Sequence, residues 1–458
     1  MDVSSNGLTG ELPASIGELG SLRSLDYSSN FVNLSVPKTI GGLQELTTLR
    51  ASFNKHTGTL PTEIGRLKQL RHLALDRNTF SGVIPTEIGN LTNVGKCHFG
   101  ACFVGRTVSR LALSETFDVG SNQLFGTIPT EFGAMGNLTE IVLAQNGLTG
   151  AIPDELMALP SLERVVLYLN FLGGNIPGYL GKMEMLAELD LSENLLSGPL
   201  PVELLESTSL KVMRLARNAI TGEFPLADTS LPVVEVIDVE ANQISGTFPA
   251  KMEVLPALSI LNLKGNQLSG LLPDEFGNLP TVKELDVSNN RLEGTLPMTI
   301  GLMQSIERLD MGLNFLSGEI PLEIGVLVTL RDLQLGHNLF FGEVPDTLAL
   351  LENLESLSLA MNGFEKPVPV ALTMMPAIKT LDLSAAALTG TFPVEFTNFP
   401  TLLSLDLSGN RLTGVLPNEG WSSLVALTSL DIGENQFSGA LPGAIGGAIL
   451  LGKSKRMQ

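Results

Sequence analysis

The chain has 458 residues and a formal net charge of −20, with 28 Lys and Arg against 48 Asp and Glu. This acidic balance favours solubility and argues against nucleic acid as the main partner. Hydrophobic residues make up 43% of the chain, and its two cysteines are too few for a framework of disulfides.

One spacing recurs along the chain with a period of 24 residues. Asparagines mark it as a ladder, at positions 6, 30, 54, 78, 122, 146, 170, 194, 218, 242, 266, 290, 314, 338, 362, 410 and 435. Cys102 and Ala386 replace asparagine at two further rungs. Because a period of this length indicates stacked repeats, we expect a single solenoid over residues 1–458 rather than several separate domains.

The repeat at 309–330 shows what each unit is expected to form. Leu309 and Met311 alternate with polar neighbours, which is the pattern of a strand with one buried face. Asn314 follows at a turn, where its amide can bond inward-facing backbone groups. Pro321 ends an extended return segment, and a loose helical turn over 322–330 follows it. No single repeat can bury its own apolar side, so neighbouring repeats must stack.

These residues give the spacing LxxLxLxxNxLxGxIPxxIGxL, as in LDMGLNFLSGEIPLEIGVL and LDLSENLLSGPLPVEL. The spacing closely resembles the plant-type leucine-rich repeat over nearly the whole chain. The resemblance implies an α/β repeat solenoid: a right-handed leucine-rich-repeat superhelix of about 18–19 repeats with a parallel β-sheet on its concave side. It also implies a second set of short strands from the LxGxIP segments.

Residues 1–96 hold regular repeats, and residues 97–121 form the main irregularity. From Cys102 to Asn122 the interval is 20 residues instead of 24, and the IPxxIG text is lost. We expect a shortened repeat there, with Cys97 and Cys102 facing inward as free thiols rather than as a disulfide. Residues 122–410 are regular apart from Ala386, whose missing amide would cost about 1 kcal/mol if a buried backbone group stayed unpaired.

Both ends of the sequence lack recognisable caps. The text MDVSSNGLTG begins within a strand and shows no signal peptide, and GAIGGAILLG is shorter than the roughly 20 apolar residues of a membrane span. Because solenoids need capping at both ends, we expect the chain to be a piece of a longer protein. The text GxxxxGKS at 447–454 matches a phosphate-binding loop, but we reject that interpretation because no helix can follow it.

Departures from the repeat text predict a ligand-binding site. Between 50 and 110 there are nine Lys or Arg against three acidic residues. Alternation places some of these on the concave face, beside apolar and aromatic side chains that we expect to be exposed. The alternative interpretation is that these departures from the repeat text are random substitutions on a surface that tolerates them and form no binding site. The predicted ligand-binding residues are Arg50, His72, Lys96, His98, Val142, Val166 and Tyr168, and a second contact strip is predicted at Val212, Val236 and Ile260.

We predict no catalytic residue, no cofactor and no metal site. His72 and His98 are expected in neighbouring strands, but Cys97 between them is expected to point inward. We therefore interpret the histidines as scattered surface residues rather than as ligands of a metal ion. No acid/base pair or nucleophile stands out from the repeat, so we expect no enzyme activity. Sequons at Asn33, Asn90 and Asn137 are compatible with glycosylation of a secreted chain, although NLT is also ordinary repeat text.

The resemblance implies a recognition solenoid similar to the extracellular, ligand-binding part of plant receptor kinases and receptor-like proteins. Its expected partner is a protein, peptide or glycan on the concave face, with a co-receptor as a further candidate. Two alternatives stay open. One is a free-standing inhibitor that resembles polygalacturonase inhibitors, and the other is an intracellular scaffold with reduced cysteines. The first interpretation places the protein outside the cell or at its surface.

Overall fold

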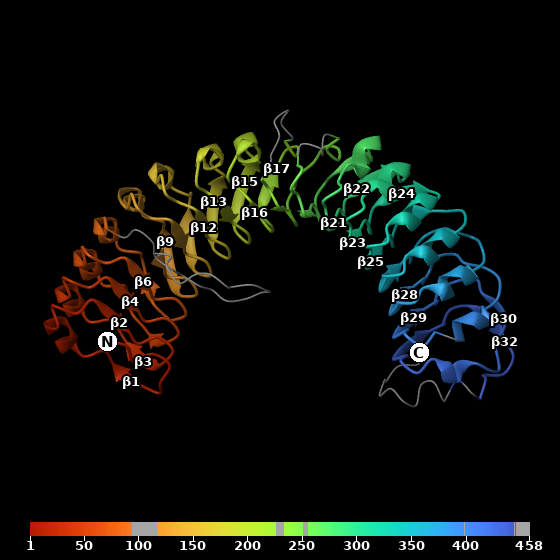
Figure 1. Ribbon diagram of the computed structural model, residues 1–458, viewed down its shortest axis with the longest axis horizontal. Coiled ribbons are helices and arrows are strands. Elements are labelled where there is room, and N and C mark those ends of the chain that lie inside the picture. The colour runs from red at the N-terminus through yellow and green to blue at the C-terminus, as the bar shows by residue number, and fades with distance from the viewer. Residues whose placement is uncertain (94–116, 226–232, 251–254, 398, 444, 446–458) are drawn as a thin grey trace. The chain divides into compact units, whose positions relative to one another are not determined.

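The computed structural model describes residues 1–93, 117–225, 233–250, 255–397, 399–443 and 445 (Figure 1). The chain divides into two compact units, Met1–Asn242 and Gln243–Gln458. Each unit is a stack of repeats, and each repeat contributes a short strand to a parallel main sheet, a return segment and a helical turn.

Parallel strands paired 24 residues apart form most of each main sheet. In the first unit they are β2 (Ser24–Asp26), β4 (Thr48–Arg50), β6 (His72–Ala74), β8 (Phe117–Asp118), β10 (Glu140–Val142), β12 (Arg164–Val166), β14 (Glu188–Asp190), β16 (Val212–Arg214) and β18 (Val236–Asp238). In the second unit they are β19 (Ile260–Asn262), β21 (Glu284–Asp286), β23 (Arg308–Asp310), β25 (Asp332–Gln334), β27 (Ser356–Ser358), β28 (Thr380–Asp382), β29 (Ser404–Asp406) and β31 (Ser429–Asp431).

Alternation decides which residues of the main sheet face inward. In β23 the central Leu309 is fully buried, and it pairs in register with the buried Leu285 and Leu333 of the neighbouring strands. Its neighbours Arg308 and Asp310 lie on the other side of the sheet, which we call the strand face. The sheet is parallel, as the resemblance implied.

Return segments form a second, discontinuous set of short strands, which we call the flank strands. In the first unit they are β1 (Thr9–Glu11), β3 (Phe31–Leu34), β5 (Lys55–His56), β7 (Ser81–Gly82), β9 (Gln123–Thr127), β11 (Gly147–Gly150), β13 (Phe171–Asn175), β15 (Leu195–Pro199) and β17 (Ala219–Thr221). In the second unit they are β20 (Ser269–Leu271), β22 (Arg291–Gly294), β24 (Phe315–Gly318), β26 (Leu339–Phe340), β30 (Thr413–Val415) and β32 (Gln436–Ser438).

The helical turns are short 3-10 helices. They are η1 (Ala14–Glu18), η2 (Lys38–Gly42), η3 (Thr62–Arg66), η4 (Thr86–Asn90), η5 (Thr130–Ala134), η6 (Asp154–Ala158), η7 (Gly178–Lys182) and η8 (Val202–Glu206), then η10 (Asp274–Gly277), η11 (Met298–Leu302), η12 (Leu322–Val326), η13 (Asp346–Leu350), η14 (Val370–Met374), η15 (Val394–Thr397) and η16 (Trp421–Ser423). Most follow a proline directly, as η12 follows Pro321, whose φ of −66° and missing N–H suit that position. Within each unit the helices lie on the side opposite the main sheet (Figure 1).

The asparagine ladder bonds the backbone as predicted. Asn314 Nδ2 donates to the carbonyl oxygens of Met311 (3.1 Å) and of Val287 in the preceding repeat (3.0 Å), and Leu292 N donates to Asn314 Oδ1 (3.0 Å). Asn338 makes the equivalent bonds one repeat later. Each amide therefore joins two repeats and satisfies main-chain groups that the turn leaves unpaired.

The ladder passes directly from Asn78 to Asn122, which corrects one expectation. Strand β6 pairs with β8, Phe80 N donates to Asn122 Oδ1 (3.0 Å), and Asn122 Nδ2 donates to Leu75 O (3.2 Å). A rung at Cys102 between the two asparagines was expected, and that expectation is wrong because Asn122 already bonds the repeat of Asn78. Cys97, Cys102 and the segment 447–454 lie outside the described residues.

At Ala386 the backbone takes over part of the missing amide's role. In a regular repeat the equivalent of Phe364 N donates a hydrogen bond to the side-chain oxygen of the rung asparagine. Here Phe364 N donates instead to the carbonyl oxygen of Ala386 (3.1 Å). The φ of 49° at Ala385 is shared by the residues before regular rungs, such as Leu313 at 55°, whereas the φ of 59° at Ala387 has no counterpart after them, so the turn is built differently there. The N–H of Phe364 is consequently paired.

Candidate functional site

The strand face of the first unit carries the described part of the predicted ligand-binding site. Arg50 closes β4, and its side chain is 49% exposed with the guanidinium 3.7 Å from the carboxylate of Asp26 on β2. His72 opens the next strand, β6, in register with Thr48. The register therefore brings Arg50 and His72 to adjacent strands of one face, as predicted.

The basic stretch around them does not form one patch. Lys55 lies in flank strand β5, with its ammonium 5.0 Å from the centre of the Phe31 ring, and Arg66 lies in η3. Of these three cations only Arg50 is on the strand face. Lys96 and His98, the other predicted cationic residues, lie outside the described residues.

Val142 and Val166 are buried, with exposed fractions of 1% and 3%. We expected both to be exposed apolar contacts, and that expectation is wrong. Alternation fixes the side of the sheet on which a residue lies, whereas its exposure depends on what else lies over that side. Tyr168, two residues beyond Val166, is half-buried, and its hydroxyl oxygen accepts a hydrogen bond from Gln145 Nε2 (3.2 Å).

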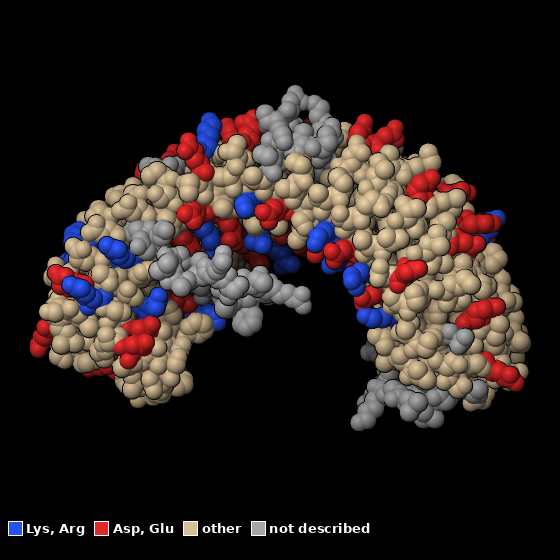
Figure 2. All heavy atoms as spheres, viewed as in Figure 1, with Lys and Arg blue, Asp and Glu red and all other residues tan. Residues whose placement is uncertain are grey.

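An ion-pair network crosses the strand face next to these residues. Arg164 on β12 bonds the carboxylates of Glu140 on β10 and Glu188 on β14, the latter at 2.8 Å. Arg214 on β16 reaches the same Glu188 at 3.3 Å. This network could have been predicted from the sequence, since Glu140, Arg164 and Glu188 open consecutive strands of the main sheet. The predicted site did not include these alternating charges. Figure 2 shows Lys and Arg side chains interleaved with Asp and Glu along the strand face.

Two acidic side chains near the predicted site are buried. Asp118 is fully buried, its Oδ1 accepts from Gly120 N (2.5 Å), and its Oδ2 has no hydrogen-bond partner among the residues that the structure describes. Burial raises the pKa of the Asp118 carboxyl well above its usual value, and the charge of Asp76 raises it further. Burial also raises the pKa of Asp76, although Ser52 donates to its carboxylate. These carboxyls therefore favour the neutral form more than exposed ones do.

The second predicted strip is divided between the two units. Val212 and Val236 lie opposite each other in register on β16 and β18, and both are partly exposed. Ile260 opens β19 in the second unit and is also partly exposed. The pairing confirms that Val212 and Val236 are neighbours on one face, and their role as a contact strip stays a prediction.

The three sequon asparagines are exposed. Asn33 lies in flank strand β3, Asn90 ends η4, and Asn137 precedes β10 and donates from Nδ2 to Thr92 O (3.3 Å). Their exposure is compatible with glycosylation, which stays a prediction.

Two broader searches cover the part of the chain that the structure describes. In it, no three His, Cys, Asp or Glu side chains are placed so that they could hold a metal ion. Likewise, no helix within those ranges is long and apolar enough to cross a lipid bilayer.

Comparisons with known families match the repeat text. A leucine-rich-repeat model matches residues 232–292 and 376–437, and a second one matches residues 69–91. A search of curated proteins finds no match.

Solved structures resemble the chain over nearly its whole length. The plant peptide hormone receptor RGFR1, solved in complex with RGF2, is 29% identical with a TM-score of 0.79, covering 98% of this chain and 76% of that one. The Arabidopsis receptor kinase HAESA, solved with the peptide hormone IDA and the co-receptor SERK1, is 30% identical with a TM-score of 0.78, covering 96% and 75%. A TDR receptor is 26% identical with a TM-score of 0.72, covering 98% and 86%.

Proposed function

The chain belongs to the plant-type leucine-rich-repeat family, and we propose that it is the peptide-recognition part of a receptor-like protein that works outside the cell. The observation that carries this proposal is its 30% identity to HAESA over 96% of the chain, since HAESA was solved with a peptide hormone and a co-receptor. RGFR1, also solved with its ligand, supports the same class of partner. The exposed sequons at Asn33, Asn90 and Asn137 agree with an extracellular location.

We place the peptide on the strand face of the first unit. Adjacent strands present one side chain each at intervals of about 4.8 Å, so a peptide crossing the strands meets a different side chain at each step. Arg50 is partly exposed and supplies a guanidinium that suits a carboxylate, and His72 and Tyr168 supply polar aromatic contacts. Lys96 and His98 complete the proposed set, whereas Val142 and Val166 are buried and are left out of it.

Binding follows from side chains held on paired strands. Because the strands are fixed by the asparagine ladder and by buried leucines, the peptide would meet a surface that is already ordered, which lowers the entropy lost on binding. No covalent step is required, and a co-receptor would meet the bound peptide together with an exposed part of the solenoid. This is the arrangement that we propose for signalling by a longer receptor.

The test combines a peptide screen with a substitution of the proposed site. We expect a collection of synthetic secreted plant peptides, screened by fluorescence anisotropy, to contain a binder whose affinity falls at least about ten-fold in the variant Arg50→Ala, Lys96→Ala, Tyr168→Ala. The thermal midpoint should change little, because Arg50 is half-exposed and Tyr168 half-buried. The matched control is Arg291→Ala, an exposed cation of flank strand β22.

Two results would count against the proposal. A peptide that binds the triple variant as tightly as the natural chain would remove this site. A collection without any binder, together with tight binding of a folded glycosidase or of a cytosolic protein, would favour an inhibitor or a scaffold instead.

A further inference from the structure

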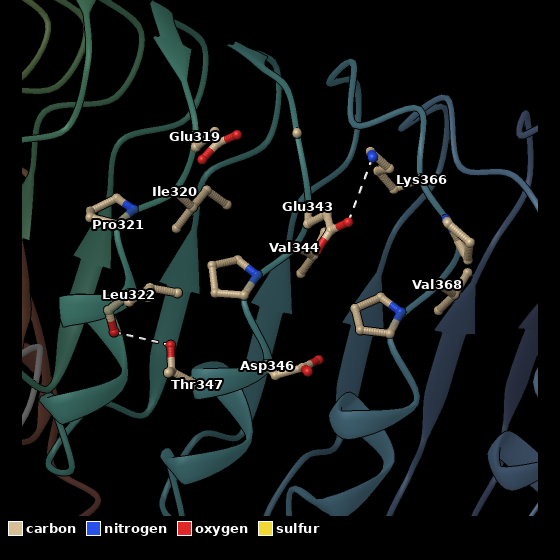
Figure 3. Close-up of a pocket in the computed structure, with 14 residues that line it drawn as sticks. Glu319, Ile320, Pro321, Leu322, Glu343, Val344, Asp346, Thr347, Lys366 and Val368 are labelled. Carbon is tan, nitrogen blue, oxygen red and sulfur yellow. Dashed lines mark hydrogen bonds and ion pairs between the residues drawn. The ribbon is translucent and has the colours of Figure 1, made fainter.

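A groove crosses the return segments of the second unit and contains none of the residues assigned to peptide binding. Its first part has a volume of about 670 Å³ and is lined by residues 319–322, 342–347 and 366–369 (Figure 3). Its second part is lined by residues of the next two repeats and shares Pro367 and Val368 with the first. We call the two parts together the flank groove.

The flank groove lies where the ladder of flank strands is interrupted. Strands β24 and β26 pair through Ser317 and Leu339, but between β26 and the next pair, β30 and β32, only isolated bridges join the described return segments, as at Phe341 and Gly363. Pro367 occupies the position that Glu343 holds one repeat earlier. Because proline has no N–H to donate, Pro367 offers a neighbouring segment one hydrogen bond fewer than Glu343 does, and an isolated bridge joins it to Thr389.

One end of the flank groove is acidic. Glu319, Glu343 and Asp346 line it and are exposed, and the single cation of the lining is Lys366. Lys366 Nζ is 3.6 Å from Glu343 Oε1 (Figure 3), and the side chain of Lys366 is half-exposed while that of Glu343 is largely exposed. Glu319 and Asp346 have no ion pair within the described ranges. Among the described residues, two exposed carboxylates at this end are therefore left without an ion pair.

The other end of the flank groove is mainly apolar, and Glu395 is the one charged side chain of its lining. Val370, Val394 and Val415 line it with exposed fractions of 46%, 55% and 64%. Pro393 and Pro417 lie beside them in the lining. Val370 and Val394 open successive helical turns and Val415 ends β30, and a ligand that removes these side chains from water gains about 25 cal/mol per Å² of apolar surface.

We propose that the flank groove binds an extended segment of a partner protein with Lys or Arg at one end and aliphatic side chains at the other. Charge complementarity selects the basic end, because neither Glu319 nor Asp346 forms an ion pair with another described residue. The return segments from Glu319 to Val415 span four repeat intervals, or about 19 Å at a spacing of about 4.8 Å. About six residues of extended chain cover that distance. This surface is distinct from the strand face and leaves it open for the peptide of the proposed function.

The experiment is a selection of random eight-residue peptides displayed on phage and panned against the immobilised full chain. Counter-selection uses the variant Glu319→Lys, Asp346→Lys, which reverses the charge of two exposed side chains. The matched control is Glu352→Lys, Glu434→Lys, which changes two exposed acids of the same unit outside the groove. Thermal unfolding of both variants checks that they fold.

We expect the selected peptides to carry basic residues followed by aliphatic ones. Their affinity should fall about ten-fold or more in the groove variant, stay unchanged in the control, and weaken with added salt. Val394→Asp, Val415→Asp should also weaken binding, through the apolar end. The proposal is overturned if no selected peptide distinguishes the natural chain from the groove variant, or if those that do lack this pattern. The Arg50, Lys96 and Tyr168 variant should bind these peptides normally, which separates this outcome from a failure of the strand-face site.

Discussion

At the scale of single residues, the asparagine ladder is the part of the structure that the sequence predicts best. The side chain must both donate and accept at a buried turn, so the period of 24 residues is visible without any structural information. The compensation at Ala386 was not visible, because it depends on a backbone carbonyl turning toward Phe364 N. Sequence patterns report which side chain is missing but not how the main chain adjusts.

Replacing a regular rung should be costly. Asn314→Ala removes the acceptor of Leu292 N and the donor to Val287 O and Met311 O, leaving buried backbone groups unpaired. We expect the free energy of unfolding, measured with urea, to fall by about 2–4 kcal/mol. The comparison is Ala386→Asn, which should change stability much less because Phe364 N is already paired. Equal effects of the two substitutions would contradict this role of the ladder.

His56 shows a buried polar residue that the sequence did not distinguish from a surface histidine. Its ring is fully buried, stacks on Phe80 at 5.4 Å and meets Tyr27 edge-on. Nδ1 lies 2.9 Å from Leu34 O and Nε2 lies 3.1 Å from the hydroxyl of Tyr27. A neutral ring that carries its proton on Nδ1 satisfies both bonds, donating to the carbonyl and accepting from the hydroxyl.

Acid should therefore destabilise the first unit through His56. Burial lowers its pKa below the usual 6.5, partly opposed by the bond to Leu34 O, so the unfolded chain binds the proton more readily. The stability that the neutral ring contributes is present above pH 6.5 and is lost as the pH falls through the lower folded pKa. We expect the drop in thermal midpoint between pH 7.5 and 5 to be smaller in His56→Phe than in the natural chain. The exposed His337→Phe serves as control, and an identical pH dependence in all three proteins would rule out the role of His56.

At the scale of elements, alternation and turn residues predicted the strands, the return segments and the helical turns that follow proline. They did not predict exposure on the strand face, as Val142 and Val166 show. They also missed the pairing of β6 with β8, because a rung counted from Asn78 at the usual period falls on Cys102. Packing constrains the inward side of each strand strongly, whereas the strand face is free to vary, so its chemistry is harder to predict.

The ion-pair network is an element-scale feature whose contribution is measurable. Arg164→Met removes the guanidinium next to the buried carboxylate of Glu140 and next to Glu188. We expect a loss of about 1–3 kcal/mol, below the usual cost for a fully buried pair because the Arg164 side chain is 37% exposed. Adding Glu140→Gln should recover part of the loss in a double-mutant cycle. A purely additive result would mean that the two charges do not interact.

At the scale of the whole molecule, the family and the fold follow from repetition, since many copies of one text constrain each other. The ligand does not follow from it, because binding depends on the few positions where the text is broken, and no packing rule fixes those. The strand face and the flank groove are such positions.

Because each repeat contacts mainly the repeats next to it, the stack predicts how a local loss of stability spreads through a unit. In a solenoid each repeat is held by its neighbours, so a lost rung weakens adjacent repeats most. In Asn314→Ala we expect hydrogen exchange to accelerate about ten-fold or more in β21, β23 and β25, because these strands adjoin the altered turn. Strands β29 and β31, several repeats away in the same unit, should keep their protection. Exchange measured by mass spectrometry that rises equally across all of these strands would show that the second unit unfolds as one cooperative block instead.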